Sequence, residues 1–340
     1  MNKIKVAVYR PHQRPHSIEG YYRNVTRCLK SVYDYDFEEF EVPEQMPSDA
    51  ALCWDPRGGR GAPHPRLADI DIPFVATFHG AAHLSMRLYQ CFGWRPSALW
   101  KGMKDRLGTT RGWHRFDPER LKVIAVSQYA KSEFSTAMRF PGRNIQVIHH
   151  GVDHDIFNQT IDNNRDVAKP YFLHVSSFQP KKNVLRLIKA YRDLQCPDKP
   201  ALLVICPGMP DIPLPQGVEV IRHAMSHEQL VGYYRNALAF LFPSLHETFG
   251  MPILEAMASG CPVVTSNVTA CPEVAGDSAV LVSPESTSAM TGAMRRIVQD
   301  QSYRLGLRER GLQRAASFSW EESARSHHHF FLTAMAETSY

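Results

Sequence analysis

Short apolar runs alternate with amphipathic stretches along the whole chain of 340 residues. The apolar runs, rich in aliphatic and aromatic residues, predict buried strands at residues 5–9, 51–54, 74–78, 122–126, 146–149, 171–175, 201–206, 218–221, 239–242, 263–265 and 279–281. The stretches between them have apolar residues at helical spacing and predict helices at 20–32, 81–91, 128–138, 184–194, 227–236, 252–259, 287–300, 304–317 and 320–335. This alternation predicts an α/β protein with parallel sheets covered by helices.

A polar stretch at residues 158–169 divides this pattern into two halves of similar length. It has little apolar content, and we expect it to link two doubly wound domains. Ligands of such sheets bind outside the carboxyl ends of the strands. Two domains that face each other would therefore form a ligand-binding cleft.

Composition narrows the class of protein. Apolar residues make up 44% of the chain, but no run of about 18 apolar residues predicts a membrane span. The charged, strand-like start lacks the apolar region of a secretory signal, and the seven cysteines include no Cys-x-x-Cys pair, so we expect free thiols in the cytoplasm. The net charge of +5 suits phosphorylated ligands or an anionic membrane surface, and it is too evenly spread to indicate nucleic acid.

The most informative segment is residues 239–264, which predicts a strand, a Gly-Met-Pro turn and a helix. Pro252 suits the first turn of that helix, and the backbone N–H groups at the helix start favour anions. Glu247 precedes the turn and Glu255 lies within the helix. We expect both carboxylates to face one pocket and to accept hydrogen bonds from hydroxyl groups. A glutamate on an amphipathic helix is common, so neither residue alone is specific.

The whole segment resembles the Glu-x7-Glu segment of the retaining glycosyltransferases of group 1, a large family that includes sucrose synthases and bacterial mannosyltransferases. The resemblance implies the GT-B fold, with two Rossmann-like domains facing a central cleft. It implies that residues 1–157 and a returning helix at 320–340 form the acceptor-side domain, and that 158–319 bind the nucleotide sugar. It further implies that Glu247 and the turn at Phe249, Gly250 and Met251 contact the donor sugar, and that Glu255 binds the ribose.

Further segments resemble the same family in the same order. Lys182, in the loop after the strand at 171–175, matches the lysine that binds the donor diphosphate, whereas Ser176 stands where many members have arginine. His79, after the strand at 74–78, matches an active-site histidine, and its implied role is to position the donor sugar through a hydroxyl. The helix opening at Gly20 is a looser match. Gly20 either allows the donor to approach the backbone or begins the helix.

The resemblance implies transfer of a hexose from a nucleoside diphosphate sugar to a hydroxyl acceptor, either a glycan or a lipid-linked glycan. Lys182 and the turn amides would stabilise the leaving diphosphate. We expect no metal and no cofactor beyond the donor, for which the loop at 179–183 favours GDP-mannose. Residues 91–117 match no segment of the family. Their tryptophans, Trp94 and Trp100 among them, alternate with basic residues, which suits an acceptor or a membrane interface, or a solvated insertion.

Two alternatives remain open. A nucleotide-dependent dehydrogenase or epimerase would have a similar α/β pattern, but residues 9–20 lack the Gly-x-Gly-x-x-Gly loop that it requires. A sugar- or nucleotide-binding module without catalytic activity would explain Ser176. The joint presence of Glu247, Glu255 and Lys182 argues against that alternative.

Overall fold

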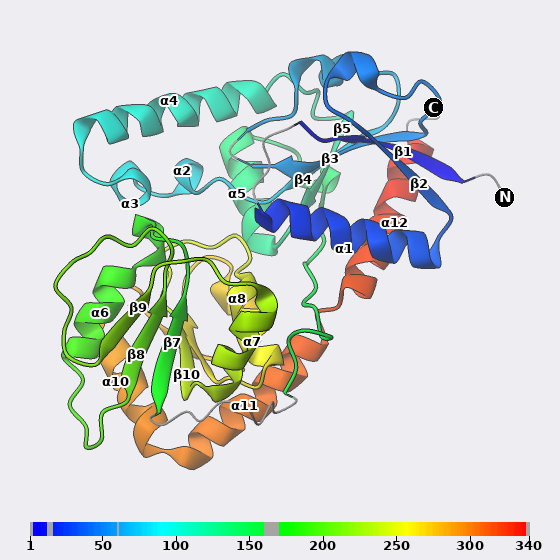
Figure 1. Ribbon diagram of the computed structural model, residues 1–340. Helices are drawn as coiled ribbons and strands as arrows, with labels where there is room; N and C mark the ends of the chain where they lie inside the picture. Colours follow the sequence, from blue (N-terminus) through cyan, green and yellow to red (C-terminus); the bar gives the residue numbers. More distant parts are fainter. Residues whose placement is uncertain (1–2, 12–15, 60, 160–169, 338–340) are drawn as a thin grey trace. The chain divides into compact units, whose positions relative to one another are not determined.

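A computed structural model describes residues 3–11, 16–59, 61–159 and 170–337. The chain forms two compact units (Figure 1). Met1–Gly151 and Ser319–Tyr340 form the first, and Val152–Phe318 form the second. Most of the expected linker, residues 160–169, lies outside the described residues.

The first unit contains a six-stranded sheet in the order β2-β1-β3-β4-β5-β6. All of its strand pairs are parallel. The strands are β1 (Ile4–Tyr9), β2 (Tyr35–Phe40), β3 (Leu52–Gly58), β4 (Phe74–Phe78), β5 (Leu121–Ala125) and β6 (Ile145–Val147). The helices are α1 (His16–Val32), α2 (Ala82–Ser85), α3 (Leu88–Phe92), α4 (Pro96–Trp113), α5 (Gln128–Met138) and α12 (Trp320–Glu337).

The second unit repeats this plan with a six-stranded sheet in the order β12-β11-β10-β7-β8-β9. Its strand pairs are again parallel. The strands are β7 (Tyr171–Val175), β8 (Ala201–Ile205), β9 (Val218–Ile221), β10 (Ala239–Phe242), β11 (Val263–Ser266) and β12 (Val280–Val282). The helices are α6 (Val184–Arg192), α7 (His227–Asn236), α8 (Met251–Ala258), α9 (Cys271–Ala275), α10 (Thr287–Gln299) and α11 (Gln301–Ala316).

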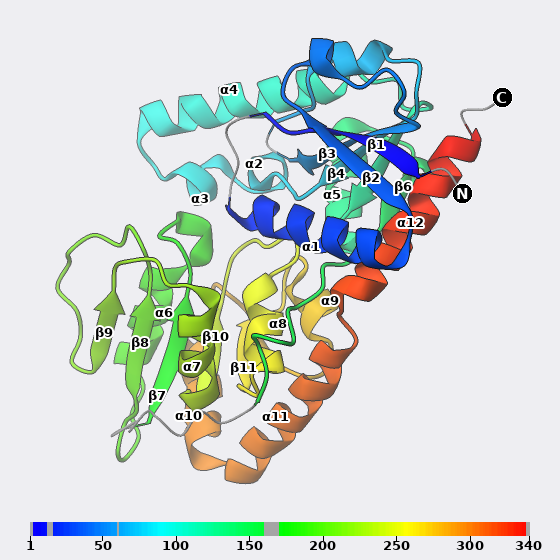
Figure 2. The same ribbon diagram turned by 45° about the vertical axis from the view of Figure 1, so that its right-hand side comes forward.

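Helices cover both faces of each sheet (Figures 1 and 2). In the first unit α1 packs against α12 on one face, and α4 packs against α5. In the second unit α6 packs against α10 over one face, and α7 packs against α8. The two sheets are therefore doubly wound and Rossmann-like, as the alternation of strands and helices predicts.

The structure departs from the expected elements in several places, one of which is the short helix α9, which was not expected. Strand β2 was not expected because acidic residues separate its three buried aromatic residues, Tyr35, Phe37 and Phe40, and interrupt the apolar run. The unmatched region at 91–117 is mainly the long helix α4. The single helix expected at 81–91 is two short helices, α2 and α3, with an extended backbone at Met86 and Arg87 between them.

A tertiary contact explains the break between α2 and α3. The guanidinium of Arg106 in α4 donates to the backbone carbonyls of His83 at 2.5 Å and Met86 at 2.8 Å. These carbonyls are at the end of α2, where a helix has no internal partners for them. Arg106 therefore satisfies the end of α2 from a neighbouring helix.

Gly151 lies where the backbone of the first unit passes close to the start of α12. Its φ is not in the left-handed region. Instead, a Cβ at this position would lie 2.2 Å from the backbone nitrogen of Trp320 and 2.4 Å from the carbonyl carbon of Ser319. Glycine is required here because the chain before residue 151 passes directly against the start of α12. Ser319 caps that helix by accepting the backbone N–H of Glu322 at 3.1 Å.

Candidate active site

The candidate site lies at the point where the strand order of the second unit reverses. The chain builds the sheet outward from β7 through β8 to β9, and then returns to the other side of β7 with β10. Ligands of open α/β sheets bind at this switch point, outside the carboxyl ends of the strands. The loop after β7 carries Lys182, and the loop after β10 carries Glu247. Two of the expected site residues therefore belong to the two strands that flank the switch point.

Lys182 and Glu247 form an ion pair at this edge of the sheet. The Nζ of Lys182 donates to Oε1 of Glu247 at 2.6 Å, and the two side chains are only 16% and 10% exposed. Burial raises the pKa of Glu247, but the ammonium groups of Lys182 and Lys181 outweigh burial and hold the pKa below its ordinary value. Glu247 is therefore a carboxylate at neutral pH, held beside two cationic side chains.

The loop that carries Lys182 is anchored by Asn183. Its backbone is left-handed, with φ of 62°, which asparagine tolerates better than most residues. Its side-chain amide donates to the backbone carbonyl of Pro243 at 2.9 Å and to that of Pro284 at 2.7 Å. These bonds tie the loop after β7 to the loops that follow β10 and β12, and they fix the base of the Lys182 side chain.

Gly250 makes the turn from the loop after β10 into α8. Its φ of 102° is in the region open mainly to glycine, and a Cβ there would also meet Ile253 at 3.1 Å. Met251 begins α8, and Pro252 occupies its first turn, as expected. The first N–H groups of a helix have no partner within it and carry partial positive charge. The turn therefore adds a favourable field for an anion close to the Lys182 loop.

Glu255 lies in α8 and is buried. Its Oε2 accepts the hydroxyl of Tyr234, from α7, at 3.1 Å. Burial raises the pKa of Glu255, while the charge of His227 and the bond from Tyr234 partly offset that rise. A buried carboxylate with a raised pKa gains stability from each further hydrogen-bond donor that approaches it. Such a group suits the hydroxyl groups of a sugar.

Thr269 is a site residue that the sequence did not reveal. It follows β11, the neighbour of β10, and its φ of 58° is exceptional for a β-branched residue. Its Oγ1 accepts the backbone N–H of Glu247 at 3.1 Å, and the next residue, Ala270, donates its N–H to the carbonyl of Glu247 at 3.2 Å. Strained residues of this kind persist where the surroundings hold them. Here the strained loop fixes the backbone of Glu247.

Ser176 stands at the end of β7 but provides no charge. The Nδ1 of His174 donates to the carbonyl of Leu241 at 2.7 Å, so Nε2 accepts the hydroxyl of Ser176 at 2.8 Å. Burial lowers the pKa of His174 to about 4, and the ring is therefore neutral. The hydrogen of Ser176 is used within the protein, and its Oγ also lies 3.9 Å from Sγ of Cys206.

The side chain of Phe249 belongs to the interior of the second unit. It is 3% exposed, and its ring packs against Phe318 with the centroids 6.0 Å apart. A ligand could therefore meet only the backbone of Phe249 in this conformation. This geometry separates Phe249 from Gly250 and Met251, whose expected contacts are made by backbone groups.

The other two expected site residues, His79 and Gly20, are in the first unit. His79 follows β4, and its Nε2 donates to the backbone carbonyl of Pro56 at 2.7 Å. Burial lowers the pKa of His79 to about 4. The ring is therefore neutral at pH 7, with its proton on Nε2.

An ordered polar chain supports the region behind His79. The indole of Trp54 donates to Thr77 at 3.0 Å, and Thr77 is bonded to Tyr21 at 3.1 Å. Tyr21 in turn donates to Nε2 of His327 at 2.6 Å, because Nδ1 of that ring donates to the carbonyl of Ser323. This chain joins α1, two strands and α12, and the ring of Tyr21 meets His79 edge-on at 4.8 Å.

Gly20 lies inside α1 and does not begin it, because that helix starts at His16. An added Cβ at Gly20 would meet no atom within 4 Å. Packing within the described structure therefore does not explain this glycine. Its backbone is open to the approach of another molecule.

One further expectation concerns the cysteines. All seven cysteines are free thiols, as expected. Within the described ranges, no group of three or more His, Cys, Asp or Glu side chains could hold a metal ion. The helices in those ranges also include none that is both long and apolar enough to span a bilayer.

Comparison with known proteins places this site in a family context. Residues 155–314 match the family described as Glycosyl transferases group 1, and residues 53–156 match Glycosyltransferase Family 4. O-antigen chain mannosyltransferase B of Escherichia coli is 30% identical over 265 residues, which are 73% of this chain and 67% of that protein. MMP alpha-(1->4)-mannosyltransferase of Mycolicibacterium hassiacum is 28% identical over 280 residues, 76% of this chain and 65% of the relative. The mannosyltransferase WbdA of Escherichia coli is longer, and the match spans 27% of it.

Solved structures share the fold. Sucrose-phosphate synthase from Thermosynechococcus elongatus superposes with a TM-score of 0.75 at 17% identity, covering 98% of this chain and 100% of that one. Anabaena HepE in complex with UDP and glucose superposes with a TM-score of 0.69 at 16% identity, covering 97% and 100%. Both likenesses extend over the two units of this chain, which accordingly has the two-domain architecture of those proteins.

Proposed function

Because this chain belongs to the glycosyl transferases group 1 family of GT-B glycosyltransferases, we propose that it moves a hexose from a nucleoside diphosphate sugar to a hydroxyl acceptor with retention of anomeric configuration. The observation that carries the proposal is the buried pair of Lys182 and Glu247 at the switch point of the second sheet. A cation beside an anion-attracting helix start suits a diphosphate, and adjacent carboxylates suit sugar hydroxyls.

Each site residue then has a role in the transfer. As the bond from the sugar to the diphosphate breaks, negative charge grows on the leaving phosphate and positive character grows on the sugar. Lys182 and the backbone N–H groups at Gly250 and Met251 would stabilise the phosphate. Preorganised stabilisation of this kind is commonly the largest catalytic contribution. Glu247 would hold sugar hydroxyls, and Glu255 would hold the ribose.

The pairing of Lys182 with Glu247 has a function of its own in this proposal. Without donor, each group satisfies the charge of the other in a buried place. When a diphosphate binds, Lys182 would pair with the phosphate in place of Glu247, and Glu247 would be freed to accept hydroxyls of the sugar. Serine at position 176 leaves the phosphates to Lys182, to its neighbour Lys181 and to the turn amides. The departing phosphate would take the proton of the acceptor hydroxyl, and no metal ion would be required.

Mannose from GDP-mannose is the donor that we propose. The relatives in Escherichia coli and Mycolicibacterium hassiacum are named as mannosyltransferases, and the first of these is named for O-antigen chains. The acceptor class that we propose is a glycan or lipid-linked glycan of the cell surface, and the relative named for O-antigen chains supports a glycan acceptor. UDP-glucose is the competing donor, since HepE has been solved with UDP and glucose.

A donor panel tests the proposal. We expect GDP-mannose to raise the melting temperature more than UDP-, ADP- or dTDP-sugars at equal concentration, and the stabilisation to be unchanged by EDTA. Incubation with donor and an oligosaccharide acceptor should release nucleoside diphosphate, and NMR of the product should show an α-linkage from the α-configured donor. Binding without release of diphosphate in the presence of acceptor would instead indicate a binding module, and a β-linked product would exclude retention.

A further inference from the structure

Helix α4 presents to solvent a face on which large apolar and basic side chains are mixed. Trp100 is 66% exposed, Met103 53% and Leu107 54%, and they lie three to four residues apart along the helix. Lys101, Lys104 and Arg111 are exposed on the same side. Trp94, which precedes the helix, is 74% exposed and stacks on Tyr89 with the ring centroids 4.0 Å apart. We call these seven residues, Trp94, Trp100, Lys101, Met103, Lys104, Leu107 and Arg111, the α4 face.

The opposite side of α4 is fully engaged, which is why the α4 face is left outward. Arg106 binds the end of α2, as described above, and Thr109 is bonded to Nε2 of His83 at 3.0 Å. Gly102 lets α3 approach, because a Cβ there would lie 2.6 Å from the ring of Phe92. The ring of Trp113 is buried against Phe134 of α5. Helix α4 is therefore fixed in orientation by its inner side.

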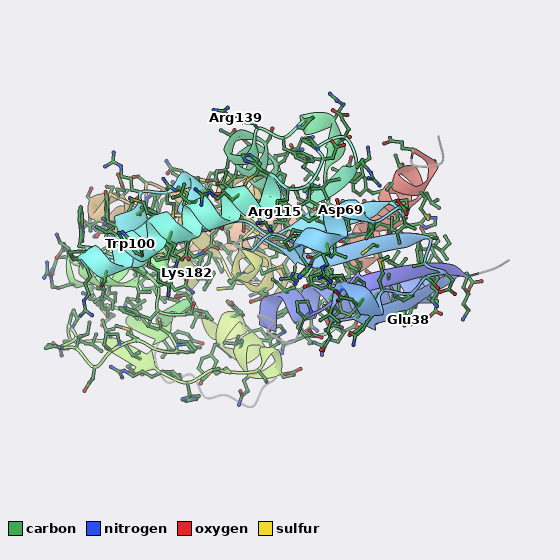
Figure 3. All side chains as sticks on the ribbon, turned by 90° about the horizontal axis from the view of Figure 1, so that it is seen from above. Glu38, Asp69, Trp100, Arg115, Arg139 and Lys182 are labelled. Atoms are coloured by element: carbon green, nitrogen blue, oxygen red, sulfur yellow. The ribbon has the colours of Figure 1, made fainter. Side chains whose placement is uncertain are left out.

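The place of helix α4 in the first unit is visible in the figures. Helices α2 and α3 run along one side of α4 in Figures 1 and 2. Figure 3 shows Trp100 toward the start of α4 and Arg115 just beyond its end. The single acidic residue of α4, Asp105, is half-buried and lies to the side of the α4 face. The exposed charge on this side of the helix is therefore positive.

We propose that the α4 face docks the protein on a bilayer that contains anionic lipid. An interfacial helix has aromatic and aliphatic side chains that enter the headgroup boundary and basic side chains that meet anionic headgroups. Tryptophan suits that boundary, and long basic side chains can place their charge at the headgroups while their apolar stems stay lower. The α4 face has all three kinds of residue, and all of its members except Trp94 lie on one side of α4.

A protein partner fits these residues less well. The buried centres of protein interfaces are depleted in lysine, whereas on the α4 face Lys101 and Lys104 lie next to Trp100 and Met103. An anionic bilayer interacts favourably with both the apolar and the basic residues. The proposal does not depend on the identity of the sugar transferred, and it can be tested without any sugar substrate.

Flotation with vesicles of phosphatidylcholine, with and without phosphatidylglycerol, tests the docking. We expect the full chain to float with the anionic vesicles and much less with the neutral ones. The variant with Lys101→Gln and Lys104→Gln should lose about thirtyfold in partition coefficient, since each basic residue near an anionic surface contributes about fivefold. The variant with Trp100→Ser and Leu107→Ser should also lose binding, and the emission of the wild-type tryptophans should shift to the blue on binding.

Matched controls separate docking from general effects. Lys189→Gln with Arg295→Gln removes two exposed charges from the second unit, and Leu305→Ser with Leu332→Ser removes two exposed leucines. Both controls should bind vesicles as the wild type does, and all variants should have the same melting temperature to within a few degrees. Equal binding to neutral and anionic vesicles, binding that survives the changes on the α4 face, or losses as large in the controls would each overturn the proposal. Failure of the donor panel described above would leave this result unaffected.

Discussion

The ammonium of Lys182 donates to the carboxylate of Glu247 at 2.6 Å although the two residues are 65 positions apart in the chain. The contact forms because β7 and β10 are neighbours in the sheet, so the loops that follow them meet at one edge. Both side chains are mostly buried, so removal of either one would leave the charge of the other buried without its partner, which lowers stability. The pair thus places a cation and an anion side by side, where a ligand with both phosphate and hydroxyl groups would bind.

Removal of Lys182 should affect diphosphates specifically. A hydrogen bond to a charged group contributes about 1.5–3 kcal/mol, so Lys182→Ala should weaken binding of a nucleoside diphosphate by about ten- to a hundredfold and leave nucleoside binding nearly unchanged. Calorimetry with both ligands measures the difference. Lys189→Ala, at an exposed position of α6, is the matched control. Equal losses for diphosphate and nucleoside in Lys182→Ala would indicate local misfolding and would contradict the assigned role.

The role of Glu255 can be tested with ligands that differ only in the ribose. If its carboxylate binds the ribose, Glu255→Ala should abolish the difference in affinity between a nucleotide and its 2′,3′-dideoxy analogue, as measured by calorimetry. Tyr234→Phe removes the hydroxyl that Glu255 accepts. It should lower the free energy of unfolding by about 1–3 kcal/mol and keep the discrimination. An unchanged preference for the ribose hydroxyls in Glu255→Ala would exclude the contact.

Gly20→Ala distinguishes an open helix position from a ligand contact. Because an added Cβ meets nothing within 4 Å, the substitution should stabilise α1 by about 0.5–1 kcal/mol, measured by urea unfolding. If the donor approaches the backbone here, the same variant should have a raised KM for the donor. Gly292→Ala in α10 is equally open and should gain stability without any change in KM. A Gly20→Ala enzyme that is both more stable and kinetically normal would remove Gly20 from the site.

The buried histidines should make the free energy of unfolding fall as the pH is lowered. Burial lowers the pKa of His79, His174 and His327 to about 4 and that of His150 well below its ordinary value. The unfolded chain therefore binds more protons than the folded one between about pH 6.5 and 4, and each histidine removes up to about 1.4 kcal/mol per pH unit as the pH falls. Asp55, whose burial raises its pKa to about 6, and Glu255, whose pKa is also raised by burial, act in the opposite sense and are outnumbered.

Urea unfolding at several pH values measures this slope. His327→Gln should reduce the slope between pH 6.5 and 4 by the share of one histidine, because glutamine can still accept the hydroxyl of Tyr21 but does not titrate there. His329→Gln, at an exposed position of the same helix, is the control and should leave the slope unchanged. Stability that is level from pH 7 to 4 would show that these rings are not held neutral.

The sequence allowed prediction of most elements because apolar runs and helical spacing mark them directly. It was less informative where side chains from other elements decide the outcome. The break between α2 and α3 depends on Arg106, which lies in another helix. In β2, acidic residues interrupt the pattern of the buried aromatic residues. Helix α4 was missed because its exposed apolar residues blur the amphipathic pattern.

The same distinction applies to the site residues. Lys182, Glu247 and the turn at Gly250 belong to local motifs, which can be recognised in the sequence without the strand order. Thr269 acts through its backbone conformation and one bond to Glu247, and neither property leaves a trace in residue type. Its place just after β11, beside β10, is the signal that could have revealed it. The neutral state of His174, which orients Ser176, likewise depends on the contact with Leu241 in β10.

The close passage of Gly151 against Ser319 and Trp320 makes the second unit an insert with adjoining ends. Val152 donates its N–H to the carbonyl of Phe318 at 3.1 Å, so the first and last residues of that insert are hydrogen-bonded partners. Residues 152–318 can therefore be excised as a closed cassette, and the remainder can be rejoined by a short glycine linker from Gly151 to Ser319. Each half should fold and be purified separately, so that nucleotide recognition can be assayed on 152–318 alone.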